Sequence, residues 1–188
     1  FMPELPEVQT VVSQLHRKIV GRTIGKFRSA WQKKIFPSYP VFVKKVKGAT
    51  VRDVRRLGKH IVIDLDNGFS LVARLKMTGH FLVKDKHNRE AEAFLDPING
   101  YIHHILTFSA GGTLEFSDMR KFGWLRIVKT DEVEKLPSIE TLGIDALSPV
   151  PTEKYLRPLL AKQKNQPRGV VLLDPPLIAG IGNLHRSE

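Results

Sequence analysis

The sequence predicts an α+β protein: an N-terminal helix, then an antiparallel β-sandwich or barrel-like domain, then a helical domain. Three observations predict this order. Apolar residues repeat at helical spacing near the start of the chain, alternation with period two dominates from Thr23 to about Val128, and prolines divide the chain into short helical pieces after Lys129.

The first predicted element is a helix over residues 6–20. Pro6 suits the first turn, Glu7 favours the positive end of a helix, and Gly21 suits the exit. Five apolar residues repeat at helical spacing, namely Val8, Val11, Val12, Leu15 and Ile19. Because the helix begins so early, the segment Pro3-Glu4-Leu5 is expected beside its N-terminal end.

Two hairpins are predicted within the sandwich. The first joins residues 61–65 to 69–73 through an Asp-Asn-Gly turn, and the second joins 102–108 to 113–116 through a Gly-rich turn. Several strands with short turns are typical of a sandwich or barrel. Residues 84–100 show no clean period and are expected to form a mobile polar loop.

The chain is predicted to divide into a sandwich domain over residues 2–132 and a helical domain over residues 133–188. In the second part, residues 152–163 and 168–174 are predicted to be helices, and the segment PLIAGIGNLHRSE is predicted to start another helix behind a Gly-rich turn. No apolar run approaches the roughly 18 residues of a membrane span.

The composition favours a folded protein that binds a polyanion. The 188 residues carry a formal net charge of +11, with 41% hydrophobic and 26% charged residues. Residues 1–94 hold 19 of the 30 Lys and Arg residues but 8 of the 19 Asp and Glu residues. Nucleic acid is the expected partner, and a merely soluble basic surface is the alternative. The chain has no cysteine, which excludes thiolate metal ligands within it.

The segment PELPEV at residues 3–8 is the most unusual one. It could be ordinary helix-start chemistry. If the chain began at Pro3 after removal of an initiator Met, however, the secondary amine of Pro3 would be a nucleophile, with a pKa of about 8. Such an amine attacks an aldehydic sugar carbon and forms an iminium. Glu4 would then supply the proton transfers.

Four further segments each allow a bland and a functional interpretation. In LGKH, Lys59 is either exposed to solvent or grips a phosphate. Met77 in LKMTGH either fills the core or inserts as a wedge into a base stack. In SDMRKFG, Arg120 reads a base edge and Phe122 acts as a wedge, or the two are a surface Arg and a core Phe. The segment AGIGN is either an ordinary Gly-rich helix entry or an anion site at a helix start, in which Asn183 adds a side-chain donor.

Together, the five segments resemble formamidopyrimidine-DNA glycosylases, in which PELPEV, LGK, a Met before a Thr/Ser-Gly turn, D-x-R-[RK]-F-G and [AV]G[IV]GN occur in this order. The resemblance covers nearly the whole chain. It implies a bacterial, cytoplasmic, nucleoid-associated, monomeric enzyme of base excision repair. Such an enzyme removes 8-oxoguanine and formamidopyrimidines from double-stranded DNA and then cuts abasic sites by β,δ-elimination.

The resemblance also implies roles for individual residues. Pro3 is similar to the family's Schiff-base nucleophile, Glu4 to its general acid/base, and Lys59 to its phosphate-contacting proton donor. Four more residues correspond to DNA contacts: Met77, His104, Arg120 and Phe122, of which Met77, Arg120 and Phe122 fill the gap left by a flipped-out base. Asn183 is similar to an asparagine that binds backbone phosphate. The related endonuclease VIII branch, which acts on oxidised pyrimidines, usually carries a different gap-filling set.

Three features depart from the family pattern. Phe1 and Met2 precede Pro3, so its nitrogen is in a tertiary amide as the sequence is written. The chain stops at HRSE, within the family's helix–two-turn–helix element. The family's four-cysteine zinc finger is absent, so the zinc expected in a complete member has no ligands here. The sequence therefore predicts either an incomplete glycosylase or an inert DNA-binding module.

Overall fold

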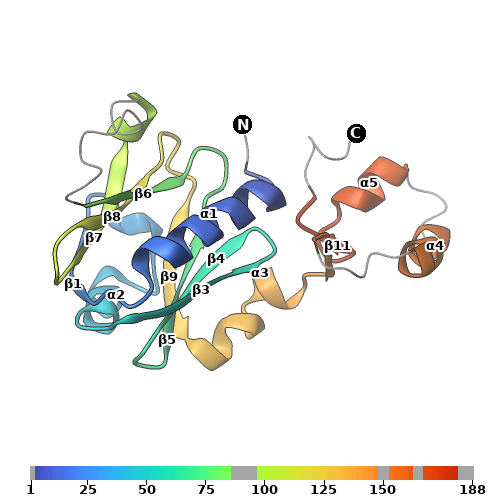
Figure 1. The fold of residues 1–188 in the computed structure, drawn as a ribbon. Coiled ribbons are helices and arrows are strands. Elements are labelled where there is room, and N and C mark those ends of the chain that lie inside the picture. Colours follow the sequence, from blue (N-terminus) through green and yellow to red (C-terminus); the bar gives the residue numbers. More distant parts are fainter. Residues whose placement is uncertain (1–2, 86–96, 148–152, 163–166, 182–188) are drawn as a thin grey trace.

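The computed structural model describes residues 3–85, 97–147, 153–162 and 167–181, and its larger part is a two-layer β-sandwich (Figure 1). The four-stranded sheet has the order β1-β7-β8-β6, and the five-stranded sheet has the order β2-β9-β5-β4-β3. The first comprises Ile24–Ser29, Ile102–Phe108, Thr113–Ser117 and His80–Lys84, and the second comprises Ile35–Phe36, Trp124–Lys129, Phe69–Arg74, His60–Leu65 and Val51–Leu57. All neighbours pair antiparallel except β2 and β9.

Two helices close the open sides of the sandwich. Helix α1 (Leu5–Ile19) contacts β3 and β6, which are edge strands of different sheets, and α2 (Tyr39–Val46) contacts the opposite edges, β1 and β2. Helix α1 buries Val8, Val12, Leu15 and Ile19 in a core shared by both sheets. Because a covered edge strand cannot pair with the edge of another chain, the two helices also protect the sandwich from edge-to-edge association.

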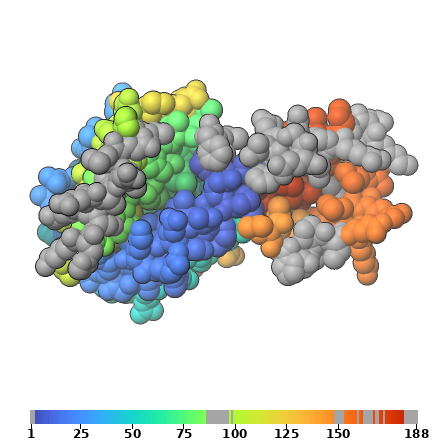
Figure 2. Space-filling view, turned by 45° about the horizontal axis from the view of Figure 1, so that its top comes forward, coloured from blue at the N-terminus to red at the C-terminus, as the bar shows by residue number. Residues whose placement is uncertain are grey.

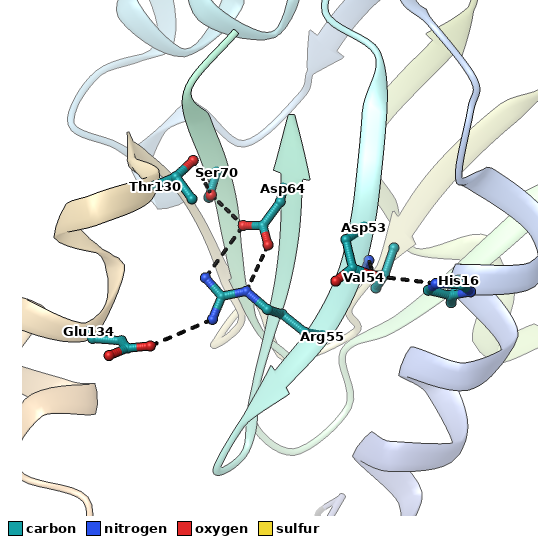
Figure 3. A network of polar contacts seen from close by, with 8 residues as sticks. All are labelled: His16, Asp53, Val54, Arg55, Asp64, Ser70, Thr130 and Glu134. Carbon is teal, nitrogen blue, oxygen red and sulfur yellow. Dashed lines mark hydrogen bonds and ion pairs between the residues drawn. The ribbon is translucent and has the colours of Figure 1, made fainter. Parts of the chain in front are cut away.

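The outer face of the five-stranded sheet is covered by the short 3-10 helix η4 (Thr130–Lys135) and by α3 (Pro137–Glu140). A polar network joins this cover to the strands (Figure 3). Arg55 Nε donates to Asp64 Oδ2 at 2.7 Å, and the Ser70 hydroxyl donates to Asp64 Oδ1 at 2.5 Å. Ser70 also lies 2.9 Å from the Thr130 hydroxyl. The network therefore fixes η4 against β3, β4 and β5.

The C-terminal part contains α4 (Glu153–Lys162), α5 (Arg168–Leu173) and a parallel pair of short strands, β10 (Ile144–Asp145) and β11 (Ile178–Ala179). The predicted helices over 152–163 and 168–174 are confirmed. Arg56 of β3 donates to Asp145 through Nη1 at 2.5 Å and Nη2 at 3.0 Å. This ion pair fastens the strand pair to the sandwich. No helix in the described ranges is long and apolar enough to cross a membrane.

The α+β class, the helix at 6–20 and both predicted hairpins are confirmed. Helix α2 was not predicted, since it lies inside the stretch assigned to period two. Its sequence YPVFVKKV is rich in β-branched residues, which favour strands. The signals for a helix were Ser38 at the N-cap, Pro40 in the first turn, and Phe42 and Val46 at i,i+4. Most of the predicted 84–100 loop lies outside the described residues, and 97–100 form a short 3-10 helix.

Candidate functional site

Strand pairing brings two of the segments singled out by the sequence to the same end of the sandwich. β5 pairs with β9, with Arg74 opposite Trp124, and β6 pairs with β8. The turn after β5 (residues 75–79) and the loop after β8 (residues 118–123) each cross from one sheet to the other. These neighbouring crossovers carry Met77, Arg120 and Phe122.

A second group of residues gathers at the start of α1. Glu4 is the N-cap residue of this helix, is 3% exposed, and donates its backbone N–H to the Glu7 carboxylate at 2.9 Å. Pro3 precedes it and is half-buried. Lys59, in the turn between β3 and β4, is close enough to feel the charge of Glu4. The structure therefore brings Pro3, Glu4 and Lys59 together, although 55 positions separate Glu4 from Lys59 in the sequence.

The segment after β11 contacts Lys59 and the start of α1. Lys59 Nζ donates to the Ile181 carbonyl oxygen at 3.0 Å. Gly180, at φ +106°, lies against the first residue of α1, where an added Cβ would be 1.7 Å from Leu5 Cδ1. Figure 2 shows the start of α1, in dark blue, where it meets the red C-terminal part. Gly180 and Ile181 therefore form one wall of the corner that holds Pro3, Glu4 and Lys59.

This corner alters the basicity of Lys59. Burial is the largest effect and lowers the pKa of its ammonium group below the usual value. The carboxylate of Glu4 opposes the shift, the Arg74 guanidinium adds to it, and Glu7 opposes it. Because the net pKa is lowered, more of the amine is unprotonated at neutral pH than on an exposed lysine. Lys59 is thus better able to exchange protons.

Met77, Arg120 and Phe122 form one contiguous group, which we call the tip cluster. Arg120 Nη1 lies 3.0 Å from Met77 Sδ, and Arg120 Cζ lies 4.9 Å from the centroid of the Phe122 ring. Phe122 is 45% exposed, Arg120 is exposed and Met77 is half-buried. None of the three belongs to the buried hydrophobic clusters. This placement favours the interpretation of Met77 and Phe122 as wedges over their interpretation as core residues.

Each crossover contains one lysine with left-handed backbone geometry, Lys76 at φ 59° and Lys121 at φ 56°. Non-glycine residues adopt this geometry at a cost of roughly 1–2 kcal/mol. Such residues cluster at functional sites, where the surrounding structure holds them in place. Lys76 precedes Met77, and Lys121 separates Arg120 from Phe122. The sharp turns therefore sit next to the side chains that project from this end.

Cations converge beside the tip cluster. Burial lowers the pKa of Lys76, and the charges of Arg74 and Lys34 lower it further, so the three groups lie near one another. Arg74 Nη1 is within 3.3 and 3.4 Å of the two ring nitrogens of His60. Burial and the Arg74 charge lower the pKa of His60 to about 4, which leaves that ring neutral at pH 7. The result is a positive surface suited to phosphates.

The placement of His104 argues against its predicted DNA contact. It is 2% exposed, its Nδ1 lies 2.9 Å from the Ser29 hydroxyl, and its ring stacks on Phe116 with centroids 5.6 Å apart. Burial lowers its pKa to about 4, so it is an uncharged core residue. The neighbouring His103 is half-buried, and its Nε2 lies 2.9 Å from the Asp118 carbonyl oxygen. A strand alternates faces, so a shift of one residue exchanges core for surface.

The predictions for Asn183 and for zinc are not addressed by these contacts. Asn183 lies outside the described residues. Within the described ranges, no group of three or more His, Asp or Glu side chains could hold a metal ion. The zinc implied by the resemblance requires cysteines that this chain does not contain, so the residues present do not fit that site.

Sequence reasoning missed the residues that hold the two crossovers in place. Asp118 is 1% exposed, and its carboxylate accepts hydrogen bonds from Thr78 and from backbone N–H groups of the loop. Gly79 and Gly123 both lie against Phe116, where an added Cβ would be 2.8 and 2.6 Å from Cζ. The available signal was an Asp directly after a strand, which favours local hydrogen bonds to the backbone.

Comparison with known proteins identifies relatives over the whole chain. The family model described as "Formamidopyrimidine-DNA glycosylase N-terminal domain" matches residues 2–125. The formamidopyrimidine-DNA glycosylase of Geobacillus kaustophilus is 33% identical over 189 residues, and that of Pelotomaculum thermopropionicum is 34% identical over 188 residues. Each alignment covers 100% of this chain and 65% of the relative. The chain thus spans about two-thirds of the length of the curated relatives it matches.

Solved structures show the same similarity. A complex of the Lactococcus lactis protein Fpg with DNA containing an abasic site matches with a TM-score of 0.81 and 25% identity, covering 99% of this chain and 65% of that one. A structure of MutM with DNA containing carbocyclic 8-oxo-G matches with a TM-score of 0.81 and 26% identity, covering 99% and 66%.

Proposed function

We infer a function from one premise: this chain belongs to the formamidopyrimidine-DNA glycosylase family, whose N-terminal-domain model matches residues 2–125. We propose that it acts in base excision repair as a DNA glycosylase and abasic-site lyase, excising oxidised purines such as 8-oxoguanine and formamidopyrimidines. The observation that carries this proposal is the contact of Lys59 with Ile181 beside Pro3 and Glu4. This contact supports the proposal because it brings the residues proposed as nucleophile, acid/base and proton donor to one corner.

In the proposed reaction, the free amine of Pro3 attacks C1′ of the damaged nucleoside. The bond from C1′ to the base breaks, the base leaves with a proton, and an iminium links Pro3 to the opened sugar. Glu4 exchanges the protons that ring opening and base departure require. Loss of the 3′ and then the 5′ phosphate by β,δ-elimination cuts the strand. Lys59, with its lowered pKa, serves both as a phosphate contact and as a proton donor.

The tip cluster is proposed to support the flipped state of the DNA. A base inside a duplex is out of reach, and flipping it out costs a few kcal/mol. Met77 and Phe122 would fill the gap, and Arg120 would face the orphaned cytosine. Their exposure and mutual contacts support this role. The cations Lys34, Arg74 and Lys76 would attract the backbone, and Asn183 is proposed as a further phosphate contact.

A second candidate is a DNA-binding protein without activity. Phe1 and Met2 precede Pro3, and while they are attached the Pro3 nitrogen is a tertiary amide that cannot form an iminium. Such a chain would bind DNA without cutting it. An endonuclease VIII-like activity on oxidised pyrimidines is the alternative within the superfamily. The tip cluster favours the purine branch.

The remaining assignments are also proposals. We divide the chain into a catalytic sandwich domain over residues 2–132 and a helical DNA-binding domain over residues 133–188. We expect a monomer on double-stranded DNA in the bacterial cytoplasm, associated with the nucleoid.

The proposal is tested by single-turnover kinetics on a chain that starts at Pro3. The substrate is a duplex with one 8-oxoguanine opposite cytosine, and we expect base release and strand cutting. Glu4→Gln should slow base release by about 10²–10⁴-fold, because an amide cannot transfer the proton. The same variant should still cut a preformed abasic site.

A duplex with an oxidised pyrimidine serves as the comparison substrate. Faster excision there would reassign the chain to the endonuclease VIII branch. Binding without base release on either substrate would select the inert DNA-binding alternative, and base release by Glu4→Gln at the wild-type rate would remove Glu4 from its role.

A further inference from the structure

We propose that Asp118 is the positioning residue of the tip cluster: its buried carboxylate clamps the two crossovers, so that Met77, Arg120 and Phe122 present one fixed surface to DNA. This inference rests on the proposed function of the tip cluster. Asp118 lies at the end of β8, behind the cluster, and is 1% exposed. It therefore acts through its neighbours and not by touching DNA.

The carboxylate binds both crossovers with its two oxygens. Oδ1 accepts the hydroxyl of Thr78, which follows Met77, and the backbone N–H of Arg120 at 3.2 Å. Oδ2 accepts the backbone N–H of Gly123 at 2.7 Å. One side chain thus ties the turn at 75–79 to both halves of the loop at 118–123.

Thr78 completes the clamp. Its hydroxyl donates to Asp118, and its oxygen also accepts the Arg120 N–H at 3.0 Å. The Arg120 N–H is therefore shared between Thr78 and Asp118. Hydrogen bonds to a carboxylate are stronger than those between neutral groups, and burial strengthens them further. The residue that carries the exposed guanidinium is thereby held at its backbone.

The backbone of Asp118 adds further contacts. Its N–H donates to the Tyr101 carbonyl oxygen at 3.0 Å, and its own carbonyl oxygen accepts the Lys121 N–H at 3.3 Å. His103 Nε2 lies 2.9 Å from that same oxygen. The clamp itself is therefore anchored to β7, and the hydrogen bond to Lys121 holds this residue, whose φ is 56°, directly before the exposed Phe122.

Base flipping gives this clamp a function beyond loop stability. The tip cluster must enter the duplex as one piece, and Arg120 must reach a base edge with correct geometry. A displacement of about 1 Å in a positioned group commonly costs about 10²-fold in rate. Loosening the clamp should therefore reduce both excision from duplex DNA and the distinction between opposite bases.

Three variants test the clamp, and one matched variant serves as control. Asp118→Ala removes the carboxylate, Asp118→Asn keeps its size, and Thr78→Val removes one hydroxyl from an otherwise similar side chain. The control is Asp64→Asn. Asp64 is also largely buried and also accepts a hydroxyl, that of Ser70, but it lies in the network on the outer face of the sheet (Figure 3).

Two measurements are made on each folded variant: backbone amide hydrogen exchange, and single-turnover excision of 8-oxoguanine opposite cytosine and opposite adenine. We expect faster exchange at Arg120 and Gly123 in the three clamp variants and not in Asp64→Asn. Excision should fall by about 10–100-fold in Asp118→Ala. The preference for cytosine should shrink, and cutting of a single-stranded abasic site should stay unchanged.

The outcomes separate this inference from the function on which it rests. All variants are made in the chain that starts at Pro3. If that chain without further substitution excises nothing, the proposed function fails, and the exchange rates alone decide whether the clamp exists. Unchanged exchange at Arg120 and Gly123 in Asp118→Ala and Thr78→Val would overturn the clamp. So would a uniform loss of excision in all variants, Asp64→Asn included, with the preference for cytosine retained.

Discussion

At the scale of single residues, the surroundings of Lys59, His60 and His104 shift their pKa values in a way that the residue types alone do not indicate. Lys59 is an ordinary lysine in the sequence, but burial and the Arg74 charge lower its pKa against the opposing charges of Glu4 and Glu7. Burial makes His60 and His104 uncharged at neutral pH in the same way. The family resemblance implied a DNA contact for His104, and the histidine itself gives no sign of which face of a strand it occupies.

The lowered pKa values of His60 and His104 predict that the protein loses stability in mild acid. Their folded-state pKa values are about 4, below the ordinary 6.5, so between these values the unfolded chain binds protons that the folded one does not. The contribution of each buried neutral ring to the free energy of unfolding is complete above pH 6.5 and is lost as the pH falls towards 4. Each histidine contributes about 2–4 kcal/mol.

Urea unfolding at pH 7.5 and pH 5.5 measures this effect above the range in which most carboxylates titrate. We expect a lower free energy of unfolding at pH 5.5, and a smaller difference in His104→Gln, which has one titrating histidine fewer. Equal stability at the two pH values would show that neither ring is held neutral in the fold.

The left-handed Lys76 supplies a second residue-scale prediction. Glycine adopts φ 59° without steric cost, whereas lysine pays roughly 1–2 kcal/mol, partly offset by the greater unfolded-state entropy of glycine. Lys76→Gly should therefore raise the free energy of unfolding by about 0.5–1 kcal/mol while weakening DNA binding. Lys76→Ala removes the same charge and keeps the strain. A gain in stability of equal size in both variants would assign the effect to charge and not to the backbone.

At the scale of elements, the site depends on how the C-terminal strand pair docks on the sandwich. Gly180 and Ile181, which directly follow β11, touch the start of α1 and Lys59. The ion pair between Arg56 and Asp145 holds the partner strand β10. The corner that holds Pro3, Glu4 and Lys59 is thus complete only when an element from the C-terminal part is in place.

Gly180→Ala tests this docking. The new Cβ would meet Leu5 at 1.7 Å, so Leu5 or β11 must move. Overpacking of this kind costs about 1–3 kcal/mol, and we expect slower abasic-site cutting as well. Gly21→Ala is the matched control, since Gly21 also has a positive φ, +82°, but nothing lies within 4 Å of its added Cβ. Equal stability and equal cutting rates in the two variants, measured by urea unfolding and by gel, would refute the docking argument.

Sequence patterns predicted the elements whose signals are local. Apolar spacing indicated α1, and turn residues indicated the hairpins β4–β5 and β7–β8. Contacts between distant segments had no such signal. The pairing of β5 with β9 and of β6 with β8, which sets the two crossovers side by side, follows from tertiary packing. The contacts of Asp118 with both crossovers depend on that pairing. The sequence therefore indicated the motif SDMRKFG but not the role of Asp118 within it.

At the scale of the whole molecule, charge and chemistry gather at one end of the sandwich. Lys34, Lys59, Arg74, Lys76 and Arg120 lie around the tip cluster and the start of α1. The basic first half of the sequence predicted a polyanion as partner, and the fold concentrates part of that charge beside the proposed nucleophile. A surface that combines cations with the exposed Phe122 and the half-buried Met77 suits a DNA duplex opened at one base.

The most direct test of the central claim is to trap the proposed iminium with borohydride on DNA that contains an abasic site. Two forms of the chain are compared, one beginning at Pro3 and one retaining Phe1 and Met2. The assignment of Pro3 as the nucleophile predicts a covalent protein–DNA adduct for the first form, with the link at Pro3 by peptide mapping, and none for the second. An adduct of equal yield from the form with Pro3 acylated, mapping to an amine such as Lys59, would contradict it.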